Sequence, residues 1–423
     1  MAAVLPIRTP AETAIIERFG REASRLPGAT TERAAAFQRL EASGLPSKRV
    51  ESYHYTDIRN VLRSLAPEAE ECAAIGAMDF PDLPHRLVLA NGRLVDGDAP
   101  KGVTIENLAD ALRSGAVRPG AAMGPAVDSI VDLNTAFCRD GLAISVSAEA
   151  SGSVLHLAFA EWMEEARLSQ PRILINVAPG IRFTLIESHY GPDSIAYQKN
   201  SVVEVLVGAG ASVEHVRINA AGNKAVMLST LAAKLEAEAE LMSLNFTAGG
   251  EVSRHQVFVT YAGENAKLTL RGATLIKDRQ HADNTLVVDH AVPHGESREL
   301  FRSVIDGAAQ GVFQGKIIVR QHAQKTDGQM ASNVLLLSDE AGMSNKPELE
   351  IFADDVVCAH GATCGALDDD QLFYLMARGL PRKEAEALLV EAFLDEALDA
   401  ISHEGLREAL AERVHDWLQA RQG

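Results

Sequence analysis

Short apolar runs recur along the middle of the chain at a nearly constant spacing. From about residue 151 to 366, runs such as ILINVA, VVEVLVG, QVFVTYAG and TLVVDH alternate with Gly, Asn and Asp. Three similar segments place Ala211, Ala239 and Ala266 at intervals of 28 and 27 residues, and Ile181 lies 30 residues before the first. Such a period is typical of a β-solenoid, whose stacked coils bury a shared core. A plain β-sandwich is the alternative, with turns about every 8 to 12 residues.

The two flanks have a different pattern from the middle. Before residue 146 the chain is expected to be mostly helical, with a helix ending at Gly44 and short strands around an Asn91-Gly92 turn. After residue 366 the apolar positions follow helical spacing. The chain therefore divides into residues 1–145, mostly helical; 146–366, the solenoid; and 367–423, all helical. The fold class is mainly β.

The C-terminal helices carry an apolar stripe whose purpose the sequence leaves open. Its members are Leu388, Leu389, Ala392, Phe393, Ala397 and Ile401. The helices could cover the end of the solenoid, because solenoids need caps. They could equally present a groove or a ridge to a partner protein.

Composition and charge limit the classes of partner. The 423 residues carry a net charge of −18, which argues against broad attraction to nucleic acid or anionic lipid. No apolar run approaches the roughly 20 residues of a membrane-spanning helix. The first 20 residues lack the basic start and uninterrupted apolar core of a secretion signal. We expect a cytoplasmic protein that binds neither nucleic acid nor membrane.

The best candidate for chemistry is Cys358-Ala359-His360, near the end of the solenoid. Alternate residues of a strand share a face, so the thiol and the imidazole are expected to point the same way. Together they could hold iron or zinc, act as a Cys–His nucleophile pair, or be structural. Cys364 lies six residues beyond Cys358, which matches no standard zinc spacing. Four cysteines make no disulfide framework.

A glycine-rich segment and a set of acids are two further motifs in the solenoid region. Gly311–Ile317 looks like a Walker A loop, but its glycines are four apart and Ile317 replaces the Ser or Thr that would touch magnesium. We therefore expect no ATP hydrolysis by this chain, and expect Gly307, Gly311 and Gly315 to turn solenoid corners. The acids Asp306, Asp354 and Asp355 leave a carbohydrate-cleaving β-helix enzyme as an alternative.

The segment Glu299–Leu380 resembles the shared core of the SufB/SufD family of the SUF iron–sulfur cluster assembly system. DHAVPH at residues 289–294 and GLPSKRVESYHYTDI at residues 44–58 also fit that family. Within the family, CAHGATCG is similar to the SufD pattern, whereas SufB members carry His-Glu-Ala at residues 360–362. SufD members more often have an aliphatic residue at position 364, and we expect Cys364 to be packed in its place.

The resemblance implies a right-handed parallel β-helix and a non-catalytic scaffold subunit that pairs with SufB and the ABC-type ATPase SufC. It implies that His360, with Cys358, lies at the SufB interface, where iron or a nascent iron–sulfur cluster is held transiently. No cofactor is expected to stay tightly bound to the isolated chain, which could form a homodimer. Cluster type, sulfur donor and flavin binding stay open. The C-terminal helices would contact SufC through residues that include Leu372, Phe373, Leu388, Leu389 and Phe393.

Overall fold

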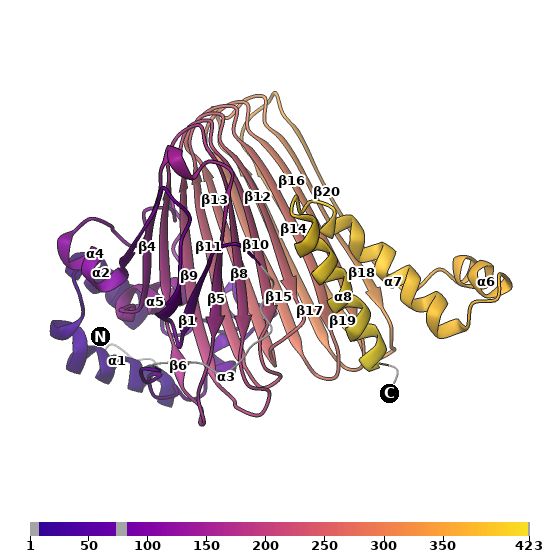
Figure 1. Cartoon of the computed structure of the whole chain (residues 1–423), viewed down its shortest axis with the longest axis horizontal. Helices are drawn as coiled ribbons and strands as arrows, with labels where there is room; N and C mark the ends of the chain where they lie inside the picture. Colours follow the sequence, from indigo (N-terminus) through magenta and orange to yellow (C-terminus); the bar gives the residue numbers. More distant parts are fainter. Residues whose placement is uncertain (1–7, 73–82, 422–423) are drawn as a thin grey trace, which may run out of the picture.

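The computed structural model describes residues 8–72 and 83–421, and its centre is a stack of strands in two facing sheets (Figure 1). Sheet B contains, in spatial order, β2 (Arg93–Gly97), β1 (Arg86–Ala90), β5 (Ser153–Ala160), β8 (Arg182–Tyr190), β10 (Ser212–Ala220), β12 (Glu240–Thr247), β14 (Lys267–Ile276), β16 (Glu296–Ile305), β18 (Asp327–Leu336) and β20 (Val357–Gly365). Sheet A contains β19 (Gly342–Ile351), β17 (Gln310–Val319), β15 (His281–His290), β13 (Val252–Tyr261), β11 (Val226–Leu235), β9 (Gln198–Val207), β7 (Arg172–Val177), β4 (Gly141–Val146) and β3 (Val103–Asn107), with β6 (Leu168–Ser169) beside β9.

From β8 onward the chain alternates between the sheets, and each strand pairs in parallel with the strand two places later. The core is therefore a β-solenoid, as the repeat predicts, and the β-sandwich alternative is wrong. The repeat marks one corner of each coil. Ala211, Ala239 and Ala266 are fully buried immediately before β10, β12 and β14. The N–H of Glu240 donates to the carbonyl of Ala211 at 2.8 Å, and that of Lys267 donates to Ala239 in the same way.

Alternate residues of each strand point into the solenoid. In β10, Val213 belongs to the apolar core between the sheets, whereas Val216 and Ile218 belong to a second core on the outer face of sheet B. The register between β10, β12, β14, β16, β18 and β20 runs without a shift. Residues at corresponding positions of successive strands therefore form rows along the solenoid, and neighbouring residues of a row are about 4.8 Å apart.

Antiparallel strands close the N-terminal end of the solenoid. β2 folds back on β1 through Asn91 and Gly92, whose φ angles of 50° and 89° make the expected turn. β3 pairs antiparallel with β4 at the corresponding edge of sheet A. At this end, the row of parallel coils stops.

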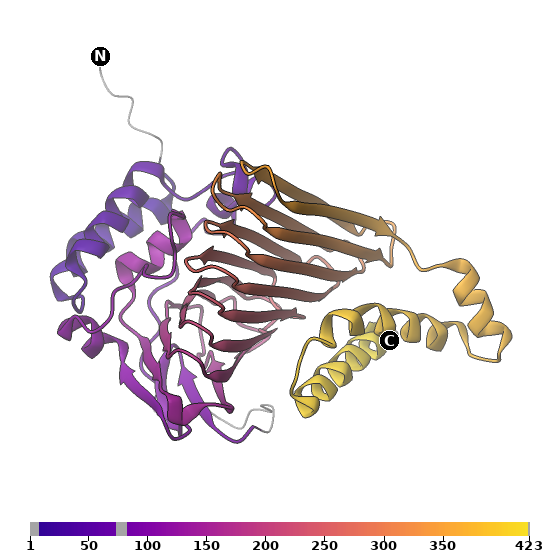
Figure 2. The same ribbon diagram turned by 90° about the horizontal axis from the view of Figure 1, so that it is seen from above.

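The N-terminal helices lie on the sheet A side of the solenoid (Figure 2). They are α1 (Pro10–Glu22), α2 (Thr30–Ser43), α3 (Ile58–Val61), α4 (Leu108–Ser114) and α5 (Ser129–Phe137), with short 3-10 turns η1 (Ala23–Arg25), η2 (Glu51–Tyr53) and η3 (Ala148–Ala150). α2 ends at Gly44, which has a φ of 71°, as expected. The amide of Asn134 in α5 donates to the carbonyl of Asn200 in β9 at 2.8 Å and so ties a helix to sheet A.

The segment between α2 and α3 is anchored on the outer face of sheet A. The hydroxyl of Tyr53 donates to Asp128 at 2.7 Å, and the guanidinium of Arg254 lies 4.1 Å from the centre of the Tyr53 ring. Arg254 also donates to the carbonyl of Ser52 and forms a fully buried ion pair with Asp283. The polar and aromatic residues of GLPSKRVESYHYTDI therefore fix the N-terminal region to the solenoid.

The C-terminal helices are α6 (Asp369–Ala377), α7 (Arg382–Leu398) and α8 (Glu404–Arg421). Val390 and Leu394 of α7 and Leu410 of α8 pack with Phe246 and Val304 on the outer face of sheet B. The helices do not cover the solenoid end, so the capping alternative is wrong. α6 projects away from the solenoid (Figures 1 and 2). Within the described residues, no helix has a stretch long and apolar enough to cross a membrane.

The apolar stripe expected on α7 is only partly the face that packs. Ala397 and Ile401 are buried, but Leu388 and Ala392 are exposed. The buried positions of α7 are Ala385, Ala387, Val390, Leu394, Ala397 and Leu398, most of which are spaced as one face of a helix. α7 is rich in Ala and Leu around its circumference, so its sequence alone marks no single face.

Candidate functional site

The C-terminal end of the solenoid is open. β19 and β20 are the last strands of the two sheets, and no described strand pairs with their outer edges. Their unpaired N–H and C=O groups are a template on which another strand can pair. Exposed apolar side chains lie close in sequence to both strands: Ile351 ends β19, Phe352 follows it, and Val357, which is 63% exposed, begins β20.

The two edges differ in chemistry. β19 contains Lys346, Pro347, Glu348 and Glu350, and charges and proline are the residues that protect an edge strand from further pairing. β20 reads VCAHGATCG and has no Lys, Arg, Asp, Glu or Pro over nine residues. β20 is therefore the edge that is better suited to accept a partner strand.

Cys358 and His360 both point into the open end of the solenoid. The row that ends at Cys358 contains Ser297 in β16 and Gly328 in β18. Both Ser297 and the half-buried Cys358 face the interior, since Ser297 is buried and Cys358 packs against the core. His360 is two residues further along β20 and so shares this face, as predicted. The His360 side chain itself is exposed, because β20 is the last strand of the sheet.

The surroundings of Cys358 do not activate its thiol. Burial raises the pKa of Cys358, the nearby carboxyls of Asp327 and Glu299 raise it further, and a hydrogen bond with the Gly328 backbone opposes them. A nucleophilic cysteine needs a stabilised thiolate, and no cation or hydrogen-bonded imidazole supplies one here. A metal ion, which displaces the thiol proton, fits the site better than covalent catalysis.

Cys358 and His360 are too few to make a complete metal site by themselves. No group of three or more His, Cys, Asp or Glu side chains is placed to hold a metal ion within residues 8–72 and 83–421. Cys364 is on the same face of β20 as Cys358 but lies six residues along the strand, about 20 Å away. Cys364 was expected to pack in place of an aliphatic residue, but it is exposed. Any cation held by Cys358 and His360 needs further ligands from outside this set.

The structure separates the residues of the other candidate sites. Gly311 and Gly315 are inside β17 and do not turn corners; a Cβ on Gly315 would lie 2.2 Å from Sδ of Met330. Gly307 alone of the three turns a corner, with a φ of 61°. Asp306 follows β16, whereas Asp354 and Asp355 precede β20. These acids therefore lie at opposite ends of sheet B strands, about 30 Å apart, and do not form a catalytic pair.

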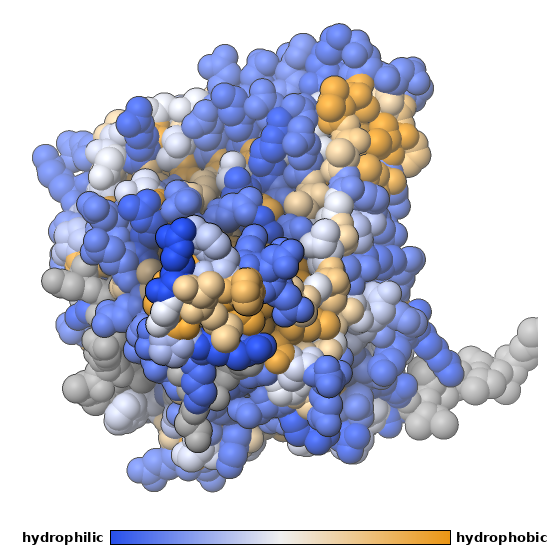
Figure 3. Space-filling model, turned by 90° about the vertical axis from the view of Figure 1, so that its right-hand side faces the viewer, coloured by the Kyte–Doolittle hydropathy of each residue, from blue (hydrophilic) through white to orange (hydrophobic). Residues whose placement is uncertain are grey.

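The predicted partner residues do not form one surface. Leu372 is 3% exposed, and Phe393 packs beneath α7 with the guanidinium of Arg302 4.7 Å from its ring centre. Phe373 is 73% exposed and Leu388 47%, while Leu389 is half-buried. Seen from the side on which α6 projects, apolar surface gathers in patches among hydrophilic side chains (Figure 3). Exposed Tyr374 and Met376 of α6 were not singled out in the sequence.

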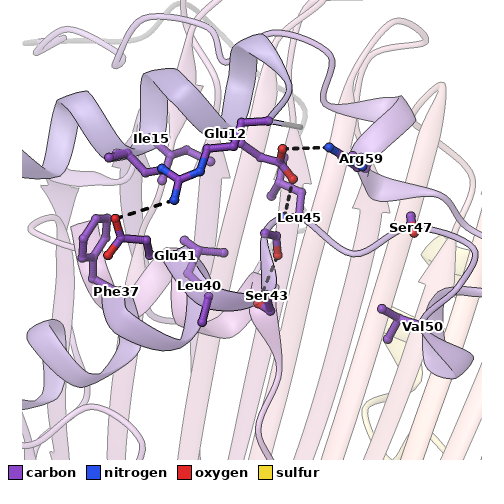
Figure 4. Close-up of a pocket in the computed structure, with 14 residues that line it drawn as sticks. Glu12, Ile15, Phe37, Leu40, Glu41, Ser43, Leu45, Ser47, Val50 and Arg59 are labelled. Carbon is purple, nitrogen blue, oxygen red and sulfur yellow. Dashed lines mark hydrogen bonds and ion pairs between the residues drawn. The ribbon is translucent and has the colours of Figure 1, made fainter. Parts of the chain in front are cut away.

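A small cavity between α1 and α2 is built around Glu12 (Figure 4). The cavity holds about 140 Å³. Glu12 accepts the N–H groups of Thr9 and Leu45 and pairs with Arg59 at 3.2 Å. Burial tends to raise the pKa of Glu12, but these partners outweigh it and lower the pKa. Its carboxylate is therefore fully used in holding α1 against the start of the GLPSKRV segment, which is a structural role.

Polar groups buried inside the solenoid escaped the sequence analysis. Nζ of Lys199 lies 2.7 Å from Oε1 of Glu161, and Oε1 of Glu187 lies 2.6 Å from Nε2 of His215, all essentially inaccessible to solvent. Nearer the open end, Glu299 is buried in the row between Leu270 and Met330. The only signal in the sequence is a charged residue at an inward position of a predicted strand.

Comparison with known proteins identifies a matching family and similar relatives. A family model described as the SufBD core domain of SUF-system iron–sulfur cluster assembly matches residues 160–393, more than half of the chain. The chain is 30% identical to an iron–sulfur cluster assembly SufBD family protein of Synechocystis sp., over 90% of this chain and 89% of the relative. It is 28% identical to the iron–sulfur cluster assembly protein SufD of Escherichia coli, over 89% of this chain and 90% of the relative. The region matched by the family model includes the whole open end.

Proposed function

Because the chain belongs to the SufBD family of the SUF iron–sulfur cluster assembly system, we propose that it is a scaffold subunit that contributes half of an assembly site to a second SufBD subunit. A role in iron–sulfur cluster assembly follows from the family itself. The finer proposal is carried by one observation: Cys358 and His360 face inward on β20, an uncharged strand whose outer edge pairs with no described strand. Iron or the nascent cluster is the cargo of this site.

The open end supports pairing with a SufB-type subunit. A strand added to β20 would satisfy its free backbone groups and cover the exposed apolar side chains at Phe352 and Val357. It would also bring side chains of the second subunit to the edge where Cys358 and His360 supply a thiolate and an imidazole. Iron and iron–sulfur clusters take such ligands. A second copy of this chain could use the same edge when no SufB-type subunit is present.

The C-terminal helices support contact with an ATPase of the SufC type. Phe373, Tyr374 and Met376 are exposed on α6, which stands clear of the solenoid, and Leu388 is exposed on α7. Apolar groups exposed together on a projecting helix are typical of a protein–protein contact. ATP hydrolysis would belong to that partner, and this chain would be non-catalytic.

Affinity capture of the tagged full chain from its host under anaerobic conditions, followed by mass spectrometry and iron analysis, tests the proposal. Three variants separate its parts. Ala362→Pro removes an N–H on the free edge, because the N–H of Val357 and of every second residue after it points to β18, and Phe373→Glu places a charge on α6. His360→Ala removes a ligand. We expect the first to lose a SufB-type subunit, the second to lose an ABC-type ATPase, and the third to keep both partners but lose iron.

Leu94→Glu is the matched control, because Leu94 is an exposed apolar residue in β2 at the closed end of the same sheet. It should keep both partners and iron. Recovery of the wild-type chain with neither partner would refute the scaffold role. Recovery of both partners with all three variants would refute the assignment of these surfaces.

A further inference from the structure

A buried carboxyl lies behind the open site. Glu299 projects inward from the middle of β16 and is 3% exposed. The unshifted register places Glu299, Met330 and His360 in one row. Glu299 is therefore two strands from His360, about 10 Å between backbones, and Met330 separates their side chains.

Gly328 leaves the neighbouring row open between Cys358 and β16. Gly328 stands between Ser297 and Cys358, and a Cβ added to it would lie 3.4 Å from Oγ of Ser297. β18 therefore puts no side chain between the Ser297 hydroxyl and the Cys358 position, and the space is bordered by Ile317 of sheet A, whose Cδ1 would also lie 3.4 Å from the added Cβ. Oγ of Ser297 lies 3.1 Å from Nε2 of the buried His290. The polar groups behind the site are thus Ser297, His290 and Glu299.

Glu299 has no partner that accounts for its burial. Neither carboxyl oxygen has a hydrogen-bond partner in the described structure, although Ser297 and the Glu299 backbone are near enough to stabilise its charge weakly. The nearest arginines, Arg271 and Arg298, donate to backbone carbonyls and, for Arg298, to Asp327. An unpaired buried carboxylate is costly, so the group is held as the neutral acid. Burial raises the pKa of Glu299 to about 8, with Arg298 and Arg271 opposing.

We propose that Glu299 is the charge-compensating carboxyl of the Cys358–His360 site, protonated while the site is empty and ionised when a divalent cation binds. This inference rests on the proposed function. Binding forms a bond between the cation and Sγ of Cys358, and the thiol proton leaves to solvent through the open end. The positive charge then favours the carboxylate, and Glu299 releases a second proton by the same route. The bound cation is thereby matched by two negative charges, which lowers the cost of its partial burial.

The groups that face Glu299 decide the pH range of this effect. Arg298 is on its own strand, Arg271 is on β14, and Tyr261 of sheet A is close enough for the Glu299 charge to raise its pKa. Cys358 is on β20, and the charge of Glu299 raises its pKa as well. Of these groups, only Glu299 changes charge near pH 8 in the empty site. The range from pH 7 to 8 therefore isolates its proton.

The first measurement needs no metal. In a Cys72→Ser, Cys364→Ser background the remaining cysteines are Cys358 and the fully buried Cys138, so the alkylation rate with iodoacetamide reports Cys358. Glu299→Gln should move the midpoint of this rate to lower pH by about 0.5 to 1 unit, because a nearby negative charge is removed. Glu296→Gln, an exposed carboxyl on the same strand, should leave it in place. Equal midpoints for Glu299→Gln and wild type would overturn the proposal.

The second measurement is Co²⁺ binding to the complex captured from the host, followed through the cobalt–thiolate absorption that Cys358 generates. From pH 7 to 8 the affinity of the wild type should rise about 50-fold, as nearly two protons are released, and that of Glu299→Gln about tenfold, as only the thiol proton is released. Equal rises overturn the role of Glu299. No Cys358-dependent binding by either protein refutes the proposed function and this role together, whatever the alkylation shows.

Discussion

Lys199 and Glu161 form an ion pair inside the solenoid, with Nζ 2.7 Å from Oε1 and both side chains at most 1% exposed. The Lys199 ammonium also lies 4.3 Å from the centre of the Phe159 ring, against which His189 stacks. Burial lowers the pKa of Lys199, while Glu161 raises it. A buried charge pair therefore lies within the apolar core of the first coils, whereas Phe301 packs on Phe313 in a later coil.

Breaking this pair should be strongly destabilising. Glu161→Gln leaves the Lys199 charge buried without a counter-charge, and we expect a loss of about 3 kcal/mol in the free energy of unfolding. Urea denaturation at pH 7 measures it. Glu240→Gln is the control, because Glu240 and Lys267 form an exposed pair at 3.8 Å and should contribute less than about 0.5 kcal/mol. If Glu161→Gln lowers the free energy of unfolding as little as the control does, Lys199 and Glu161 do not form a buried ion pair.

Glu299 should make the protein less stable as the pH rises. Its pKa is about 8 in the folded chain against an ordinary 4.5, so between these values the unfolded chain ionises and the folded chain does not. Stability relative to Glu299→Gln is therefore complete below pH 4.5 and is lost progressively up to pH 8, by at most about 4 kcal/mol. Urea denaturation of both proteins at pH 5 and pH 8 tests this. Parallel changes in the two proteins would show that Glu299 is ionised when folded.

Buried histidines should make the protein sensitive to acid. Burial lowers the pKa of His156, His189 and His290 to about 3, from an ordinary 6.5. Their contribution to stability is complete above pH 6.5 and is lost as the pH falls towards 3, because the unfolded chain takes up the protons first. Together the three contribute a slope of about 4 kcal/mol per pH unit in that range.

The change in the free energy of unfolding per pH unit, and not its absolute value, measures the contribution of each buried histidine. His290→Gln removes a ring that stacks on Tyr261 at 4.2 Å, so it lowers stability at every pH, but it should also reduce the slope between pH 6 and 4 by about 1.4 kcal/mol per pH unit. The exposed His322→Gln is the matched control and should leave the slope as in the wild type. An unchanged slope for His290→Gln would mean that His290 is protonated in the folded chain.

The features that sequence predicted correctly depend on local spacing. The coil period could be found because Ala211, Ala239 and Ala266 recur at one buried corner of successive coils. The common face of Cys358 and His360 follows from the two-residue period of a single strand. Both results need no knowledge of which distant segments pack together.

The features that sequence missed depend on such packing. Lys199 and Glu161 are 38 residues apart, and they meet across the solenoid interior because Glu161 follows β5 of sheet B and Lys199 is in β9 of sheet A. Glu299 lies near the Cys358 site only through the register of three strands. The buried face of α7 is chosen by sheet B, and its own sequence offered Leu388 as readily as Val390.

His360 and Cys364 should differ sharply in their effect on cluster assembly, although both are exposed on β20 and face the same side. His360 is two residues from the thiol of Cys358, while Cys364 is about 20 Å from it and cannot share its cation. We expect His360→Ala to reduce iron recovered with the complex at least tenfold, as loss of a direct ligand does, and Cys364→Ser to leave it within twofold. Iron and acid-labile sulfide in the captured complex give the readout, and urea denaturation checks that both variants fold. Equal iron in His360→Ala and wild type would remove His360 from the site, whereas a large loss in Cys364→Ser would require a second site at the far end of β20.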